Sequence, residues 1–308
     1  MTRVVVFSGR FMALMVFLSC LFLYLGCEDE LKIDAEKRSS KLVVNSVVNP
    51  EAIFEVHISQ SLGLTQPGDL KYLENAVVKV TNRKDQTKTV LPHNYQGFYF
   101  LDGFKPDAGS SYSIEVSHPG YVSATSSTQV PNPVTAEFID SLRTFRHTVK
   151  VLDIDLKIVD PNEEQNYYII EALRNFTVEQ EGQPIEQYYI AMLLTQDPAS
   201  ENDDFGSNVF LNRIYLPDQK FSGKTYQLKI SSELFFEDQG GTLEILVKSV
   251  SKDLYDYLKS LEQFRMFGDD PNFSSPIQVR NNIVDGLGVF GSFTQERIVL
   301  SFAKNGND

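Results

Sequence analysis

The chain has 308 residues, of which 28 are Lys or Arg and 41 are Asp or Glu, so its formal net charge is −13. An acidic chain is repelled by phosphate backbones, and we therefore expect no nucleic-acid partner. The two cysteines, Cys20 and Cys27, lie near the N-terminus, which excludes a disulfide framework and a cysteine-ligated metal site from the rest of the chain.

Residues 1–26 have the pattern of a lipoprotein signal peptide. Arg3 and Arg10 are followed by an uncharged apolar run of about fifteen residues, which suits a signal sequence and is short for a membrane-spanning helix. The run ends in Gly26-Cys27, and a small residue followed by cysteine is what a lipoprotein signal peptidase recognises. We therefore predict lipid attachment at Cys27 and a membrane anchor through that lipid.

Two alternatives to this anchor are less favoured. Cleavage before Cys20 would leave an apolar mature N-terminus, and a buried thiol at Cys27 is incompatible with the acidic run Glu28, Asp29 and Glu30 that follows it. Residues 27–40 are polar and charged, which predicts a flexible tether with an average span of about 20 Å. Without residues 1–26 the net charge becomes −15, from 26 basic and 41 acidic residues.

Residues 41–131 predict an immunoglobulin-like β-sandwich. Phe54, Val56 and Ile58 alternate with polar residues, as expected for a strand with one buried and one wet face. We expect Tyr112 to return its hydroxyl to the backbone, as a tyrosine corner does. Short apolar runs separated by turn residues predict strands at 41–48, 53–59, 75–81, 97–102, 111–117 and 121–130.

The segment 130–135 contains two prolines and is interpreted as a short, stiff linker. Beyond it, residues 134–308 predict a larger β-rich domain. Its expected strands are 149–160, 166–179, 187–195, 209–216, 225–231 and 242–250.

One amphipathic helix interrupts this second domain at 251–267, where apolar residues recur at helical spacing between a possible N-cap, Ser251, and a stop at Gly268. Asp285-Gly286 between apolar runs predicts a two-residue hairpin, so that residues 282–293 would fold back before a last strand at 297–302.

No catalytic motif is found, and the four histidines, His57, His93, His118 and His147, are not at metal-ligand spacing. We therefore predict that the protein is not an enzyme and has no cofactor and no metal. Glu201, Asp203 and Asp204 lie in a long polar loop at 197–208 and Asp269-Asp270 follow the helix. Neither cluster has a calcium-loop pattern, and solvated loops are favoured, with weak calcium binding at 201–204 left open.

Several stretches resemble one protein family along nearly the whole mature chain. They are "KLVVNSVVNPEAIFEVHISQS", "ENAVVKV", "GSSYSIEVSHPGYVSATSSTQVP", "SVSKDLYDYLKSLE" and "FSSPIQVRNNIVDGLGVFGSF". On these the chain is similar to the domain of unknown function 4249 family, outer-membrane lipoproteins of Bacteroidota that are often encoded beside TonB-dependent receptors. The resemblance implies a cell-surface accessory role, and it brings no enzymatic activity and no set of binding residues that could be carried over to this chain. Glu28, Asp29 and Glu30 resemble a signal for export to the outer leaflet.

Three hypotheses follow. The leading one is a surface-exposed outer-membrane lipoprotein that acts as a non-enzymatic binding or accessory partner of a TonB-dependent outer-membrane transporter. The second is an extracytoplasmic glycan or peptide hydrolase whose carboxylates are gathered from separate strands, which a structure would reveal as two carboxylates in a deep cleft. The third is a structural adhesin or assembly factor with flat surfaces and no small ligand.

Overall fold

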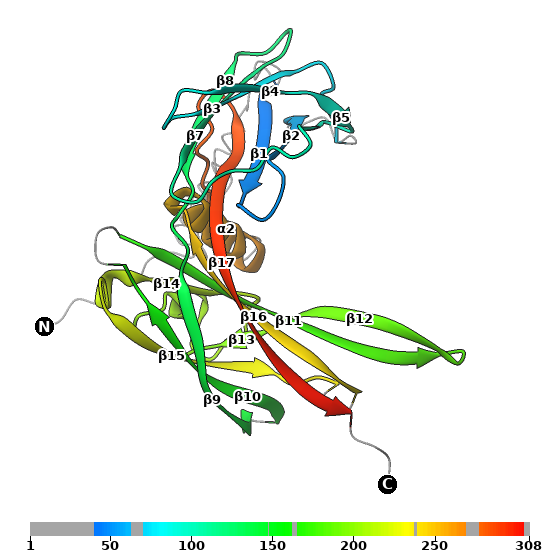
Figure 1. Ribbon diagram of the computed structural model, residues 1–308, viewed down its shortest axis with the longest axis vertical. Coiled ribbons are helices and arrows are strands. Elements are labelled where there is room, and N and C mark those ends of the chain that lie inside the picture. Colours follow the sequence, from blue (N-terminus) through cyan, green and yellow to red (C-terminus); the bar gives the residue numbers. More distant parts are fainter. Residues whose placement is uncertain are drawn as a thin grey trace, which may run out of the picture. The chain divides into compact units, whose positions relative to one another are not determined.

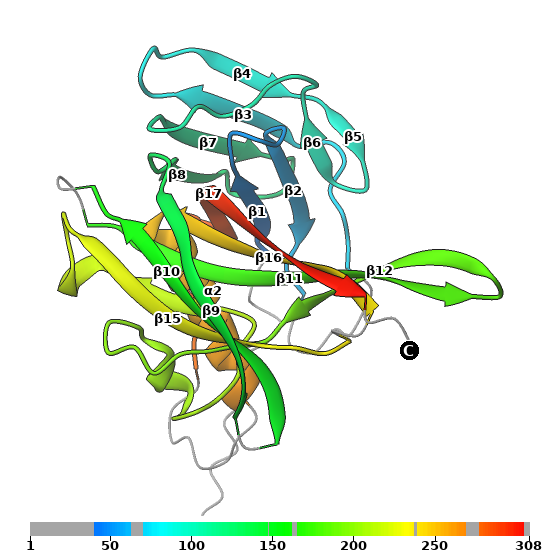
Figure 2. The same ribbon diagram turned by 60° about the horizontal axis from the view of Figure 1, so that its bottom comes forward.

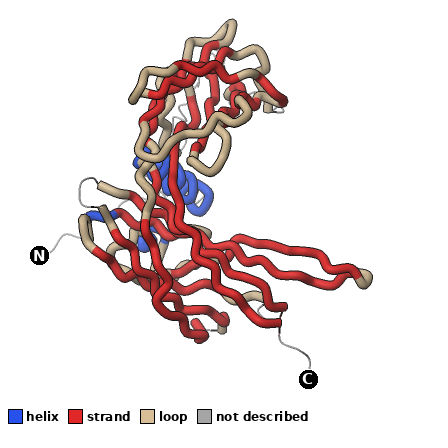
Figure 3. Tube along the Cα trace, in the orientation of Figure 1, coloured by secondary structure: helices blue, strands red, loops and turns tan. Residues whose placement is uncertain are grey.

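Strands dominate the structure, and one long α-helix stands out among them (Figure 3). The computed structural model describes residues 40–62, 70–146, 148–161, 165–236, 239–268 and 277–304, all of which belong to one compact unit. The mainly β fold class with one amphipathic helix is thus confirmed. No helix of these ranges is both long and apolar enough to cross a membrane.

The strands of the described residues form three sheets, whose elements are labelled in Figure 1. A nine-stranded sheet has the order β12-β11-β16-β17-β1-β2-β6-β5, with β14 also paired to β11, and two four-stranded sheets have the orders β13-β15-β10-β9 and β4-β3-β7-β8. The strands are β1 (Leu42–Val48), β2 (Glu55–Gln60), β3 (Val77–Asn82), β4 (Lys88–Leu91), β5 (His93–Tyr95), β6 (Phe98–Phe100), β7 (Ser111–Ser117), β8 (Ala124–Gln129), β9 (Thr135–Arg146), β10 (Val149–Val159), β11 (Tyr167–Gln180), β12 (Gln183–Ala191), β13 (Leu193–Leu194), β14 (Ile214–Pro217), β15 (Thr225–Glu233), β16 (Gln239–Val250) and β17 (Leu287–Lys304).

The N-terminal sandwich packs β4-β3-β7-β8 against β1, β2 and β6. Phe54, Val56 and Ile58 are fully buried, as their alternation predicts. Tyr112 is also buried, and its hydroxyl accepts a hydrogen bond of 3.0 Å from the backbone N–H of Asp107. The expected return of this hydroxyl to the backbone is confirmed. The core of the N-terminal sandwich is therefore made by alternating apolar residues, together with a buried tyrosine whose hydroxyl is bonded to the backbone of a turn.

Strand β17 pairs with two different strands along its length. Its first residues, Leu287–Ser292, pair in parallel with β1, and its remaining residues pair antiparallel with β16. The predicted fold-back at Asp285-Gly286 is present, since the Asn282 side chain is hydrogen-bonded to the backbone of Phe290, but no strand directly precedes the turn in the described residues and the predicted two-stranded hairpin is wrong. Asp285 does adopt a turn conformation with φ of 59°, but Val284 before it bridges Thr125 of β8, and the chain after it continues as one strand. The turn therefore directs the chain onto distant strands, where Figure 1 shows β17 in red.

The second part packs β13-β15-β10-β9 against the half of the large sheet that contains β11 and β16 (Figure 2). Their facing side chains form the largest core, which includes Leu156, Tyr168 and Val247. Val130 is buried in the first core and Val134 in this one, so the linker residues between them connect the two.

Helix α2 (Lys252–Phe267) agrees with the predicted helix and its boundaries at Ser251 and Gly268. It packs through Leu254 and Tyr255 on the other face of the large sheet, over Ile169 and Val289. Two short 3₁₀ helices, η2 (Asn202–Phe205) and η3 (Asp218–Lys220), lie in the loops beside β14.

Candidate binding groove

An open groove of about 690 Å³ lies along the outer face of the sheet β13-β15-β10-β9, opposite the core. Side chains at alternating positions of three strands reach this face because successive residues of a strand point to opposite sides. The groove is lined by Asp140, Ser141 and Leu142 of β9, Arg146 at the end of β9, Asp153 and Asp155 of β10, Gln227, Lys229, Ile230 and Ser231 of β15, and Leu194, Thr195, Gln196, Asp197 and Pro198 at and after β13.

Asp153 is held in place by two neighbours. One carboxylate oxygen accepts a hydrogen bond of 2.5 Å from the Ser231 hydroxyl, and the other lies 2.7 Å from a guanidinium nitrogen of Arg146. Each partner comes from a different strand, so sheet pairing fixes the carboxylate in one orientation. Bonds of this kind to an ionised partner are the stronger ones in proteins.

The next carboxylates in the groove are also tied to neighbours. Asp155 lies 3.4 Å from the Lys229 ammonium and 3.3 Å from the side-chain amide of Gln227. Asp197 accepts a hydrogen bond of 2.5 Å from the Tyr226 hydroxyl and one of 2.8 Å from the backbone N–H of Ala199. Burial raises the pKa of Tyr226, and the hydrogen bond to Asp197 raises it further, so the phenol stays protonated and continues to donate.

The groove is acidic and preformed. Four aspartates line it against two cationic side chains, and none of the described lining residues is aromatic. Leu142, exposed to 67%, supplies an apolar side chain at its margin. Such a surface suits a partner that presents hydrogen-bond donors or positive charge.

The predicted lipid-attachment residue Cys27 and the predicted export signal Glu28, Asp29 and Glu30 lie outside the described residues, as do Asp269-Asp270. The acidic loop is described. Lys259 of α2 lies 2.7 Å from Glu201 and 2.6 Å from Asp204, and the Tyr255 hydroxyl donates to Glu201. Within the described residues, no three His, Cys, Asp or Glu side chains are grouped to hold a metal ion.

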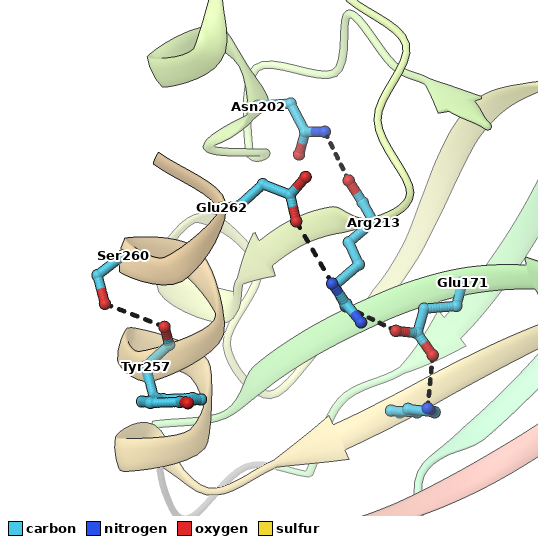
Figure 4. A network of polar contacts seen from close by, with 7 residues as sticks. Glu171, Asn202, Arg213, Tyr257, Ser260 and Glu262 are labelled. Atoms are coloured by element: carbon cyan, nitrogen blue, oxygen red, sulfur yellow. Dashed lines mark hydrogen bonds and ion pairs between the residues drawn. The ribbon is translucent and has the colours of Figure 1, made fainter. Parts of the chain in front are cut away.

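A second polar cluster lies between α2 and the large sheet (Figure 4). Arg213 lies 2.6 Å from Glu171 of β11 and 3.4 Å from Glu262 of α2, and Lys248 of β16 lies 2.5 Å from Glu171. Asn202 donates to the backbone carbonyl of Arg213 and so holds its position. One guanidinium therefore joins two carboxylates from separate elements.

The electrostatics of this cluster are those of a structural network. Burial acts to raise the pKa of Glu171, but the charges of Lys248 and Arg213 outweigh burial and hold the pKa below its ordinary value. A general acid in glycoside hydrolysis needs a raised pKa. Glu171 therefore does not have the raised pKa that a general acid of this kind requires.

The groove residues were not singled out from the sequence, although one signal was present. Asp153 and Asp155 alternate with buried residues in β10, which places both on the outer face. Strand β9 gave no such signal because a β-bulge interrupts its alternation between Phe138 and Asp140.

Fold and groove together define the class. This is a strand-rich protein with an N-terminal immunoglobulin-like sandwich and a larger β-rich part that carries one helix and an open acidic groove. The chain belongs to the family described as domain of unknown function DUF4249, whose model matches residues 28–298. No curated protein matches the chain.

Two solved structures are similar at low identity. A protein from Bacteroides uniformis ATCC 8492, provisionally described as carbohydrate binding, is 9% identical, with 84% of this chain and 98% of that chain covered and a TM-score of 0.15. The C-terminal globular domain of an oligosaccharyltransferase from Pyrococcus abyssi is 11% identical, with 86% of this chain and 47% of that chain covered and a TM-score of 0.14. At such TM-scores neither similarity carries an argument about this chain.

Proposed function

We propose that this protein is a surface-exposed outer-membrane lipoprotein that acts as a non-enzymatic binding or accessory partner of a TonB-dependent outer-membrane transporter. The groove on β9, β10 and β15 carries the binding part of this proposal, because its carboxylates are already oriented by hydrogen bonds before any partner arrives. A surface organised in advance loses less conformational freedom on binding.

The anchor and the location rest on the sequence. The apolar run that ends in Gly26-Cys27 supports lipid attachment, and Glu28, Asp29 and Glu30 support export to the outer leaflet. The proposed mechanism is capture by surface complementarity, without a covalent step.

The anchor is tested by replacing Cys27 with Ala in the full chain. The variant is expected to leave the membrane fraction, and an unchanged distribution would contradict lipid attachment. Replacing Glu28, Asp29 and Glu30 together with Ala is expected to keep the protein in the membrane fraction but protect it from protease added to intact cells. Continued digestion would contradict the export signal.

The partner is tested by gentle extraction of the full chain and identification of co-purifying proteins. Co-purification of a TonB-dependent receptor with the unmodified chain, and its loss on replacing Asp153 and Asp155 with Asn, is expected. Replacing Glu115 with Gln, an exposed carboxylate on β7 of the sandwich, is the matched control. Equal recovery from the unmodified chain and the groove variant would show that the groove is not the contact surface.

A further inference from the structure

Strand β9 is the outer strand of its sheet and is unusually apolar for that position. Among the described strands, only β10 pairs with it, so β9 lies at the edge of this sheet. Phe138, Leu142 and Phe145 are exposed to 40, 67 and 62%. A long edge strand with exposed apolar side chains is a template for pairing with another strand, and proteins normally cover or block it.

The two faces of β9 follow from its pairing with β10. Glu137 lies 2.5 Å from Lys157, Arg146 lies 2.7 Å from Asp153, and Leu142 lines the groove, so these three side chains are on the outer face. Arg143 lies over the Phe302 ring on the core side. Phe138 is opposite the buried Leu156 and shares that side.

Because of the bulge, residues at the two ends of β9 have side chains on corresponding faces of the sheet. Asp140 pairs with Asp155 and Phe138 with Leu156, so Ile139 is the extra residue of the bulge. With Ile139 set aside, Leu142 is the midpoint between Glu137 and Arg146, and residues at equal distances on its two sides have side chains on the same face.

We propose that β9 pairs antiparallel with β9 of a second copy of this chain, about a two-fold axis at Leu142. In this register Glu137 faces Arg146 of the other copy on the outer face, and Phe138 faces Phe145 on the core face. Leu142 faces its own equivalent. Opposite charges and aromatic pairs directly across two antiparallel strands are stabilising, and a two-fold axis forms each contact twice.

The other long edge strand, β12, has features that oppose pairing with a further strand. It carries Pro184, which has no N–H to donate to a neighbouring strand, and its one charged residue is Glu186. It has no opposite charge with which a second copy could pair. Strand β12 therefore lacks the self-complementary charges that β9 has.

Pairing through β9 would also join two grooves. Asp140, Leu142 and Arg146 line the groove and lie on the outer face of β9, so the grooves of both copies would meet on one face of a continuous sheet. A pair would then present two adjacent binding surfaces to one partner, which raises avidity without a new contact to that partner. The pairing itself does not depend on the proposed function.

Disulfide trapping tests the register in cells that express the full chain. The sequence beyond Cys27 contains no cysteine, so Leu142→Cys adds one thiol to the described part. Equivalent positions at a two-fold axis between antiparallel strands have Cβ atoms within about 5.5 Å, which suits a disulfide. We expect oxidant to give a covalent dimer in high yield. Tyr188→Cys, exposed to 78% on β12, is the control for random collision, and equal yields from both variants would overturn the proposal.

Charge reversal tests the contacts without relying on a disulfide. Glu137→Arg places two cations opposite each other and Arg146→Glu two carboxylates, so each variant alone is expected to dimerise about tenfold more weakly than the unmodified chain. A mixture of the two variants, or a chain carrying both changes, restores both pairs and is expected to recover the dimer in analytical ultracentrifugation of detergent-solubilised full chain. A monomeric unmodified chain, or no recovery on mixing, would refute the two-fold pairing.

Discussion

The ring of Phe290, in the last strand, lies 5.9 Å from the ring of Phe54, which precedes the second strand. Both side chains are fully buried in the core of the N-terminal sandwich. Ile283 also belongs to this core, so residues near the C-terminal end complete a sandwich that begins at Leu42. The core of the sandwich therefore depends in part on residues from the last strand and the segment before it.

This dependence predicts a large effect of Phe290→Ala. Removing a fully buried phenylalanine leaves a cavity, and we expect the free energy of unfolding to fall by about 3–5 kcal/mol. Denaturant unfolding of the full chain, followed by circular dichroism, measures the change. Phe264→Ala is the control because Phe264 on α2 is 47% exposed, and an equal loss in both variants would contradict the role of Phe290.

Two buried tyrosines differ in the hydrogen bonding of their hydroxyl groups. Removing each hydroxyl should therefore change the free energy of unfolding by different amounts. The Tyr112 hydroxyl accepts from Asp107, whereas the Tyr215 hydroxyl is buried near Arg213 and forms no hydrogen bond of ordinary geometry within the described residues. Tyr112→Phe is expected to lower the free energy of unfolding by about 1 kcal/mol, and Tyr215→Phe to leave it unchanged or raise it. Chemical denaturation of both variants checks this, and a larger loss at Tyr215 would show that its hydroxyl is bonded in solution.

The network at Glu171 predicts an acid-sensitive contribution to stability. Because Lys248 and Arg213 hold the folded-state pKa of Glu171 below its ordinary value of 4.5, the carboxylate stabilises the fold above that pH. The contribution is lost as the pH falls from 4.5 through the lower folded-state value, since protons then bind the unfolded chain more readily.

We therefore expect Glu171→Gln to lower stability at pH 7 and to show a smaller further loss than the unmodified chain on acidification below pH 4.5. Thermal unfolding across this pH range measures both effects. Glu115→Gln on the sandwich surface is the control, since Glu115 lies 3.6 Å from Lys79 with its side chain 52% exposed. Parallel pH profiles for Glu171→Gln and the unmodified chain would contradict the assignment.

Gly288 is required where β17 approaches β1. Its φ is +113°, and a Cβ atom there would lie 2.2 Å from the backbone oxygen of Val44. Gly288→Ala must therefore displace one strand from the other, and we expect a greater loss than the cost of about 1 kcal/mol for Gly103→Ala, which has positive φ but open space around it. The midpoints of denaturant unfolding of the two variants measure the difference. Equal midpoints would show that β1 can shift away from β17 at little cost in stability.

Local patterns predicted most elements. The helix at 251–267 was predicted with its two boundaries because helical spacing and both end residues lie within one continuous segment. The strand at Ser111–Ser117 was likewise predicted with both ends, since its alternation is uninterrupted. Strand β9 was missed because the bulge at Ile139 shifts the alternation by one residue, and a shifted pattern resembles no regular strand.

The groove could be predicted only in part. The alternation of Asp153 and Asp155 in β10 places both on one face, but nothing near them in the sequence indicates that Arg146 and Ser231 would reach Asp153. Those contacts depend on the order β15-β10-β9 in the sheet. Strand order follows from the packing of the whole core, which no local pattern contains.

The sequence by itself determined the β-rich class, the helix and the turn at Asp285, because each depends on neighbouring residues, and the anchor at Cys27 stays a prediction from the same kind of local pattern. Tertiary structure alone decided that the chain after Asp285 runs on as one strand from β1 to β16, and that an arginine joins Glu171 to Glu262. The physical reason is the same in both cases: backbone hydrogen bonds and buried charges are satisfied by whichever partner the packed core brings within reach, and that partner is often remote in the sequence.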